Sequence, residues 1–320
     1  MLMSVNIRSV FSDGWKDVKN NPILFVPNAL FSISLIILLF LFIAVSTLIF
    51  FEDAVLTYPN NGIVLELLPN LIGEAFIVYL LTFLLVGLVL FLLSIYLQTG
   101  LIGMTYDAAK TGKTSLSKMF FYGNKYFLRF LSASFLVLLN LFLPAFILFL
   151  LIFAGGLLSS SFSNAADSSF FILFAIGFVF YLVYLFIASV YLYFVLHAII
   201  IDDLSAIEGI LKSISLFKQN KKDVFIFFLI MFAVFIMSLI LTSAFNSLSS
   251  IPISNVTFNP GSFLWSVFKS VFLSTFVTVW ATRMYLALTR NGCCYGCLDE
   301  ENGAGCSDEN CEEQNADTDF

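Results

Sequence analysis

The sequence predicts an all-α integral membrane protein with six transmembrane helices, arranged as three repeats of an amphipathic interfacial helix followed by a transmembrane hairpin. The chain of 320 residues is 60% hydrophobic and 11% charged, whereas soluble domains carry about 25% charged residues. Its charge-free intervals reach the length of a membrane span, about 20 residues. A similar amphipathic segment precedes each pair of apolar runs.

Six apolar runs supply the predicted spans, which cover residues 26–51, 76–100, 127–153, 170–197, 224–245 and 263–288. The stretch 246–261 separates the last two spans, because it contains Pro252 and the turn sequence Asn259-Pro260-Gly261. The runs are continuously apolar, so we expect helices and not the alternating strands of a membrane β-barrel. Residues 1–290 therefore form a polytopic membrane domain, and residues 291–320 form a tail.

The amphipathic segments show helical spacing of their apolar residues. The first places on one face Ile7, Val10, Phe11, Gly14, Trp15 and Val18, and the third places there Leu204, Ile207, Ile210, Leu211, Ile214 and Phe217. The second, residues 115–127, is weaker, and we expect the polar break Gly123-Asn124-Lys125 to end it. Ser205 and Glu208 predict a capping box at the start of the third. Such helices either lie among lipid headgroups or pack their apolar faces on the bundle.

The basic residues predict the orientation of the spans. Fourteen of the 15 Lys and Arg residues flank the same ends of the spans, and Lys269 is the one cation on the opposite side. Since Lys and Arg concentrate in cytoplasmic loops, both termini are predicted to face the cytoplasm. We therefore expect a multi-pass protein of the cell membrane.

Two segments carry a resemblance to known membrane domains. They are residues 201–213, continuing into Lys218-Gln219-Asn220, and Phe11-Ser12-Asp13-Gly14-Trp15-Lys16-Asp17-Val18-Lys19-Asn20-Asn21-Pro22. Both resemble prokaryotic six-helix membrane-domain families of unknown function, related to the membrane domain of glycerophosphoryl diester phosphodiesterases. The resemblance covers residues 1–290 and implies a six-helix domain without known catalytic residues. The water-soluble phosphodiesterase domain has no counterpart in this sequence, so that activity is not carried over.

Three polar residues are predicted to lie at membrane depth. Lys269, in the sixth span, either extends to the interface or lines a polar cavity. Asn28 in the first span and Asn140 in the third each have a proline nearby, Pro27 and Pro144. They mark either packing kinks with interhelical hydrogen bonds or the lining of a cavity. One continuous cavity lined by Asn28, Asn140 and Lys269 would favour a transporter or channel.

The tail differs from the rest of the chain in composition. It holds all five cysteines and nine acidic residues without a basic one, which predicts disorder in the absence of metal. Four of its cysteines form two closely spaced pairs, Cys294, Cys297, Cys306 and Cys311, a pattern that suits zinc or iron. The alternative is a set of reduced thiols on an unstructured cytoplasmic tail.

The scarcity of ionisable residues at membrane depth decides between the classes of function. His197 is the only histidine, and the neighbouring Asp202 and Asp203 are interpreted as helix caps, so no catalytic residue is predicted. We therefore expect a non-enzymatic membrane scaffold or accessory domain. Its partners would be the lipid bilayer, another membrane protein or a second copy of the chain, with no nucleic acid and no certain cofactor. The alternative is a transporter or channel for a small solute or a lipid-like molecule.

Overall fold

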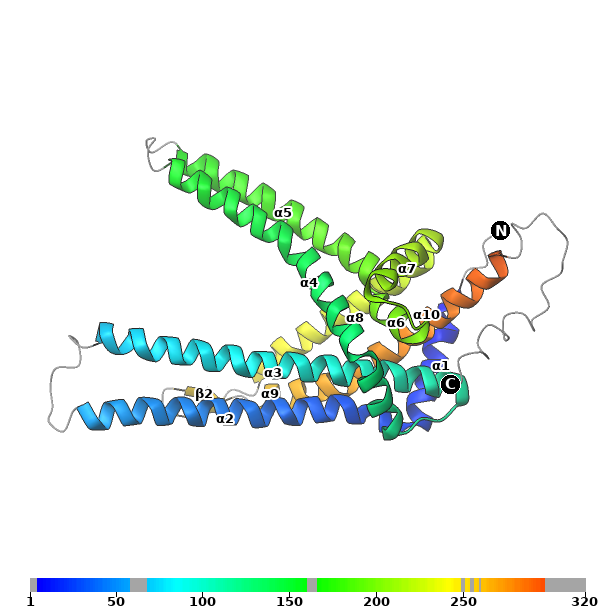
Figure 1. Ribbon diagram of the computed structural model, residues 1–320, viewed down its shortest axis with the longest axis horizontal. Helices are drawn as coiled ribbons and strands as arrows, with labels where there is room; N and C mark the ends of the chain where they lie inside the picture. Colours follow the sequence, from blue (N-terminus) through cyan, green and yellow to red (C-terminus); the bar gives the residue numbers. More distant parts are fainter. Residues whose placement is uncertain are drawn as a thin grey trace.

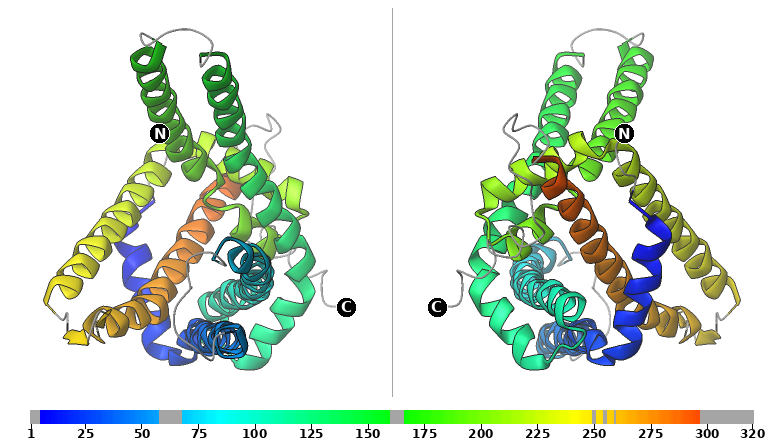
Figure 2. Two further views of the ribbon diagram at one scale, coloured as in Figure 1. Left: turned by 90° about the vertical axis from the view of Figure 1, so that its left-hand side faces the viewer. Right: turned by 90° about the vertical axis from the view of Figure 1, so that its right-hand side faces the viewer.

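Three helical hairpins diverge from a common base (Figures 1 and 2). The computed structural model describes residues 5–57, 68–159, 166–248, 251–253, 256–258 and 260–296. The first hairpin consists of α2 (Val26–Thr57) and α3 (Leu68–Thr111), and the second of α4 (Leu116–Ser159) and α5 (Ala166–Leu192). The third pairs α8 (Lys221–Leu248) with a continuous run of α9 (Pro260–Phe268), a π-helical turn η2 (Lys269–Leu273) and α10 (Ser274–Gly296).

Six helical stretches of the described chain are long and apolar enough to cross a membrane. They are Pro22–Val45, Leu80–Thr111, Leu116–Leu150, Ala175–Ile201, Lys221–Ser247 and Gly261–Thr289. The fourth is interrupted by a turn at Tyr193 and Phe194, between α5 and α6 (Val195–Ile201). The prediction of six apolar helices is therefore confirmed by length and composition.

The base is where the hairpins meet the short helices α1 (Ile7–Asn20), η1 (Pro22–Phe25), α6 and α7 (Ala206–Gln219). Here α1 packs on α10, the beginning of α4 packs on α3, and α7 packs on α6. The largest fully buried side chains lie in this region, among them Phe194, Phe227 and Tyr285. The base thus carries the packed core of the molecule.

The hairpins beyond the base, which we call the arms, expose their apolar side chains. Phe40 on α2 is 69% exposed, Phe180 on α5 is 71% exposed and Ile240 on α8 is 64% exposed. This exposure suits a hydrocarbon solvent, because lipid tails are as apolar as these side chains.

The second amphipathic segment is not a separate helix. α4 begins at Leu116 and continues without interruption through Gly123-Asn124-Lys125, so the predicted break is wrong. Gly123 packs on the ring of Tyr96, whose hydroxyl donates a hydrogen bond of 3.0 Å to Asn124 Oδ1. These contacts with α3 stabilise the helix where its composition alone favoured an end.

Two further differences concern connections. The stretch between α8 and α9 contains an antiparallel pair of strands, β1 (Ile251–Ile253) and β2 (Val256–Phe258). The all-α prediction missed it because a three-residue strand is too short to show a periodic pattern. At the other end, α10 continues to Gly296, past residue 290, where we placed the end of the membrane domain.

Candidate functional site

Helix α1 has one face that is buried against α10. Its buried residues are Val10, Gly14, Asp17 and Val18, so a carboxylate shares the apolar face. A side chain at Gly14 would begin 2.6 Å from Cδ1 of Trp280, which means that only glycine allows α1 and α10 to approach this closely. The close approach places Asp17 within reach of α10.

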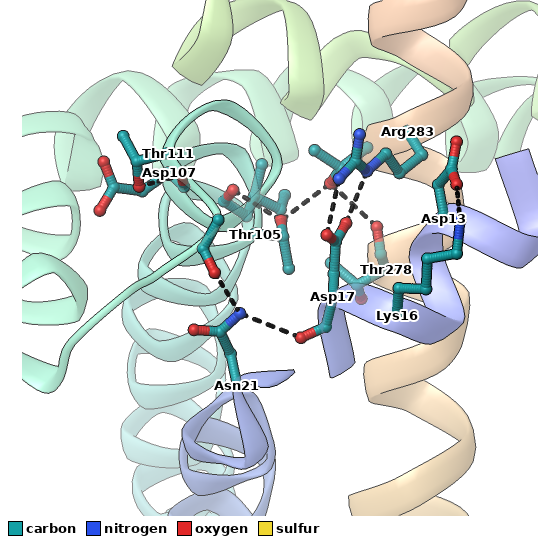
Figure 3. A network of polar contacts seen from close by, with 12 residues as sticks. Asp13, Lys16, Asp17, Asn21, Thr105, Asp107, Thr111, Thr278 and Arg283 are labelled. Carbon is teal, nitrogen blue, oxygen red and sulfur yellow. Dashed lines mark hydrogen bonds and ion pairs between the residues drawn. The ribbon is translucent and has the colours of Figure 1, made fainter. Parts of the chain in front are cut away.

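Asp17 forms a two-pronged ion pair with Arg283 of α10, shown in Figure 3. Arg283 Nη2 donates to Asp17 Oδ1 at 2.6 Å, and Nε donates to the other carboxylate oxygen. The side chain of Asp17 is 9% exposed and that of Arg283 is 25% exposed. Two-pronged pairs of arginine with a carboxylate are among the stronger hydrogen-bonded ion pairs in proteins, and this one is largely buried.

Hydrogen bonds connect this ion pair to α3, and we call the whole set the polar junction: Asp17, Asn21, Thr105, Thr282 and Arg283. Asn21 donates to the carbonyls of Asp17 and Gly112, each at 3.1 Å, and accepts from the backbone N–H of Thr114. The hydroxyls of Thr105 and Thr282 lie 2.9 Å apart. The polar junction therefore joins α1, α3 and α10 at the base.

The loop between α6 and α7 carries a second group of polar contacts. Asp203, at a positive φ of 52°, accepts hydrogen bonds from Arg129 and from Lys125 Nζ at 3.2 Å, both on α4. Asp202 accepts from the Tyr285 hydroxyl at 2.7 Å. Partial burial raises the pKa of Asp203, but hydrogen bonds and positive charge from Lys125 and Arg129 outweigh it and hold that pKa below its usual value.

The predicted capping box is confirmed at the start of α7. Ser205 accepts a hydrogen bond from the backbone N–H of Glu208, and Glu208 accepts one from the backbone N–H of Ser205. Asp202 is the C-cap of α6, as the sequence interpretation proposed.

His197 lies in the base between aromatic rings. It is 7% exposed, and its ring centroid is 6.3 Å from that of Tyr285 and 6.1 Å from that of Phe194. Neither ring nitrogen makes a hydrogen bond of normal geometry with the described residues. The ring of His197 thus packs between aromatic side chains.

The predicted cavity residues are distributed over all three hairpins: Asn28 on α2, Asn140 on α4 and Lys269 in η2. Asn28 Nδ2 donates to Thr275 Oγ1 at 2.8 Å, and one turn further along α2 the hydroxyls of Ser32 and Ser270 lie 3.0 Å apart. Lys269 precedes Ser270 in the π-helical turn, so Asn28 and Lys269 belong to neighbouring helices. Asn140 lies in the second hairpin, where it accepts a hydrogen bond from the Tyr184 hydroxyl.

The proposed metal site lies outside the described residues for the most part. Cys297, Cys306 and Cys311 fall beyond Gly296, and of Cys294 only the helical backbone is described. Within the described residues, no three His, Cys, Asp or Glu side chains are grouped so that they could hold a metal ion.

Sequence reasoning missed the polar junction. Arg283 was interpreted only as a positive residue at the end of a span, and Asp17 received no role. A signal existed, because Asp17 follows Val10 by seven residues and Gly14 by three, which is the spacing of one helical face. Nothing in the sequence, however, pairs Asp17 with a residue 266 positions away.

Six apolar helices long enough to cross a membrane, joined at their base by buried polar links, indicate a helical membrane protein. The chain belongs to a family described as a domain of unknown function (DUF7847), which matches residues 5–288. No curated protein and no solved structure matches the chain. The family match carries no link to glycerophosphoryl diester phosphodiesterases, so that relationship stays a prediction.

Proposed function

We propose that this protein is a non-enzymatic membrane scaffold or accessory domain whose arms contact lipids or partner proteins. The observation that carries the proposal is the contrast between a packed base and divergent, exposed arms (Figure 2). A transport pathway needs a polar surface enclosed between helices. In the described residues, several polar groups of the hairpins bond across helices instead: Asn28 with Thr275, Ser32 with Ser270, and the side-chain oxygen of Asn140 with Tyr184.

The test is to measure the separation of the arms in a lipid bilayer. Spin labels at Leu41 on α2, Phe180 on α5 and Met237 on α8 occupy exposed positions, in a variant whose five native cysteines are replaced by serine. We expect long pairwise distances in vesicles of phosphatidylethanolamine and phosphatidylglycerol. A second pair of labels within α4 and α5 is the control, because its distance does not depend on arm separation. Short distances between all three arms would mean a closed bundle and would overturn the proposal.

The orientation belongs to the same proposal: the base faces the cytoplasm of a cell membrane. The basic residues support it, since Lys125, Arg129, Lys212 and Arg283 all lie at the base, while Lys269 lies in the third arm. Reporter fusions after residues 61, 164 and 255 should read as external, and fusions after residues 113, 221 and 291 as internal. A consistent inversion at any of these positions would contradict the orientation.

We also propose that the base is built on a three-fold repeat. The fourth, eighth and eleventh residues of α1, α4 and α7 are buried in each case, and the eighth is always small. These residues are Val10, Gly14 and Asp17, then Met119, Gly123 and Tyr126, and finally Gly209, Ser213 and Leu216. Leucine at Gly14, Gly123 or Ser213 should each loosen the base, whereas leucine at Ser132, the exposed seventeenth residue of α4, should not. Tolerance of leucine at all three eighth positions would contradict the repeat.

The runner-up function is a transporter or channel for a small solute or a lipid-like molecule. It is favoured by the π-helical turn Lys269–Leu273, because such turns often occur at functional sites, and by the hydroxyl contacts that surround it. Vesicles loaded with carboxyfluorescein distinguish the two functions. Dye release that depends on the protein and is lost in Lys269→Leu would support the channel; vesicles that stay tight support the scaffold.

The cysteine-rich tail is proposed to bind zinc or iron through Cys294, Cys297, Cys306 and Cys311. The nine carboxylates of the tail attract cations, and the thiols must lose protons to bind, so metal binding should strengthen as pH rises. Elemental analysis of the full-length protein and of a variant ending at residue 290 tests this. Near-stoichiometric metal that disappears with the tail supports the site, and equal metal content in both contradicts it.

A further inference from the structure

The second arm presents a polar group to the lipid. Pro144 lies inside α4 and has no backbone N–H, which leaves the carbonyl of Asn140 without its usual helical partner. The Tyr184 hydroxyl of α5 supplies that partner, lying 2.9 Å from the Asn140 carbonyl and 2.8 Å from Asn140 Oδ1. The Tyr181 hydroxyl donates to the next carbonyl, that of Leu141, at 3.1 Å. The backbone acceptors of Asn140 and Leu141 are therefore satisfied within the hairpin.

The amide donors of Asn140 are not satisfied. Asn140 is exposed, and its Nδ2 has no hydrogen-bond partner in the part of the chain that the structure describes. Asn140 follows Arg129 by 11 residues. That separation is about 16 Å of helix, or about half the hydrocarbon thickness of a bilayer. Lipid tails offer no acceptor at this depth, so an unpaired amide there is unfavourable.

We propose that Asn140 is the central contact of an interface between the second arms of two copies of this chain. An asparagine amide has both donors and an acceptor, and Oδ1 can accept a second hydrogen bond beside that from Tyr184. Two copies related by a two-fold axis bring Asn140 opposite Asn140, and each Nδ2 then donates to the Oδ1 of the other copy. A second copy of the chain thus offers both the donor and the acceptor that the Asn140 amide needs, and no other residue is required.

The surrounding surface fits a helix–helix contact. Leu143 and Ile147, three and seven residues after Asn140, lie on the same side of α4 and are both 49% exposed. The second arm diverges from the other two hairpins (Figures 1 and 2), and the exposure of Asn140, Leu143 and Ile147 leaves this side of α4 open to another chain. The inference deepens the proposed function, on which it rests only in treating the arm as a contact surface.

Cysteine cross-linking in vesicles tests the interface. Ile147→Cys, in the full chain with the five native cysteines replaced by serine, places one thiol on the proposed contact side. We expect a cross-linked dimer after mild oxidation, and about tenfold weaker dimerisation when Asn140→Leu is added, the effect of one or two interhelical hydrogen bonds. Leu139→Ala, at a neighbouring exposed position without a hydrogen-bonding group, is the matched control and should leave dimerisation unchanged.

The test gives a different result if something other than a second copy covers this side of α4. If Asn140→Leu leaves the dimer fraction unchanged, or if a photoreactive group at Leu143 labels only phospholipid, the interface between copies is excluded. Asn140→Leu keeps the hydrogen bond from Tyr184 to the backbone carbonyl, and circular dichroism should confirm an unchanged fold. The arm distances measured in the same samples separate the two proposals, because a monomer with divergent arms contradicts the interface and leaves the scaffold intact.

Discussion

The base and the arms of this molecule have similar composition and opposite environments. Phe194 at the base is 1% exposed, whereas Phe180, on the same span, is 71% exposed. Both regions are rich in Phe and Leu, so hydrophobicity does not decide which side chains are buried. The base differs in its paired charged groups, such as Asp17 and Arg283, and in the close approach of α1 to α10 at Gly14.

The difference follows from the solvent. Lipid supplies no hydrophobic driving force for helix association, so helices associate through close backbone packing and interhelical hydrogen bonds. Gly14, Gly103 and Gly209 provide close approach at the base. On the first arm, a side chain added at Gly87 would meet nothing within 4 Å.

The base and the arms should differ most in how much stability they lose when a phenylalanine is truncated to alanine. Phe194→Ala should lower the free energy of unfolding by about 3–5 kcal/mol, because it opens a cavity in the packed core of the base. Phe180→Ala should change it by less than about 0.5 kcal/mol, since lipid replaces the lost contacts. Thermal unfolding of the purified protein in detergent micelles measures both. Equal losses at the two positions would mean that the arm is packed in the membrane.

Removing one partner of the buried ion pair should have the second largest effect on stability. Asp17→Ala leaves Arg283 partly buried without a counter-charge. We expect it to lower the free energy of unfolding by about 3 kcal/mol, the lower end of the range for buried ion pairs. The double variant with Arg283→Met should regain part of that loss, because no unpaired charge is left. The same unfolding assay tests both variants. A double variant that is less stable than Asp17→Ala would show that the two residues act separately.

Glycine-to-alanine substitutions should change the stability of the protein in opposite directions in the two regions. Gly14→Ala places a methyl group 2.6 Å from Trp280 Cδ1 and should destabilise the base by about 1–3 kcal/mol. Gly87→Ala meets open space and should stabilise the protein by about 0.5–1 kcal/mol through helix propensity. A shift of the unfolding midpoint in the same direction for both would contradict the assignment of close contact to Gly14 and of open space to Gly87.

The sequence predicts the elements better than their contacts. Long apolar runs are sufficient to identify six helices, and Ser205 with Glu208 is sufficient to identify a cap, because both signals are local. The pairing of Asp17 with Arg283 depends on how α1 crosses α10, which no local pattern encodes. The uninterrupted start of α4 is missed for the same reason, since Tyr96 of α3 stabilises it.

The smallest expected effect concerns pH and the loop between α6 and α7. The pKa of Asp203 lies below its ordinary value of 3.8, because its hydrogen bonds and ion pairs with Lys125 and Arg129 outweigh its partial burial. A carboxyl whose pKa is lower in the folded state stabilises the protein above its unfolded pKa, and this contribution disappears as pH falls through the folded pKa. Stability from Asp203 should therefore be complete near neutral pH and decline in acid, below pH 3.8.

The size of this effect is limited by solvent. The Asp203 side chain is 47% exposed, so screening holds its contribution below about 1 kcal/mol. Unfolding midpoints of the wild type and of Asp203→Asn should differ near neutral pH and converge in acid, and added salt should reduce the difference. Arg129→Gln removes one partner and should flatten the pH dependence in the same way. A constant difference between wild type and Asp203→Asn at every pH would mean that Asp203 acts through the backbone geometry of its positive φ and not through its charge.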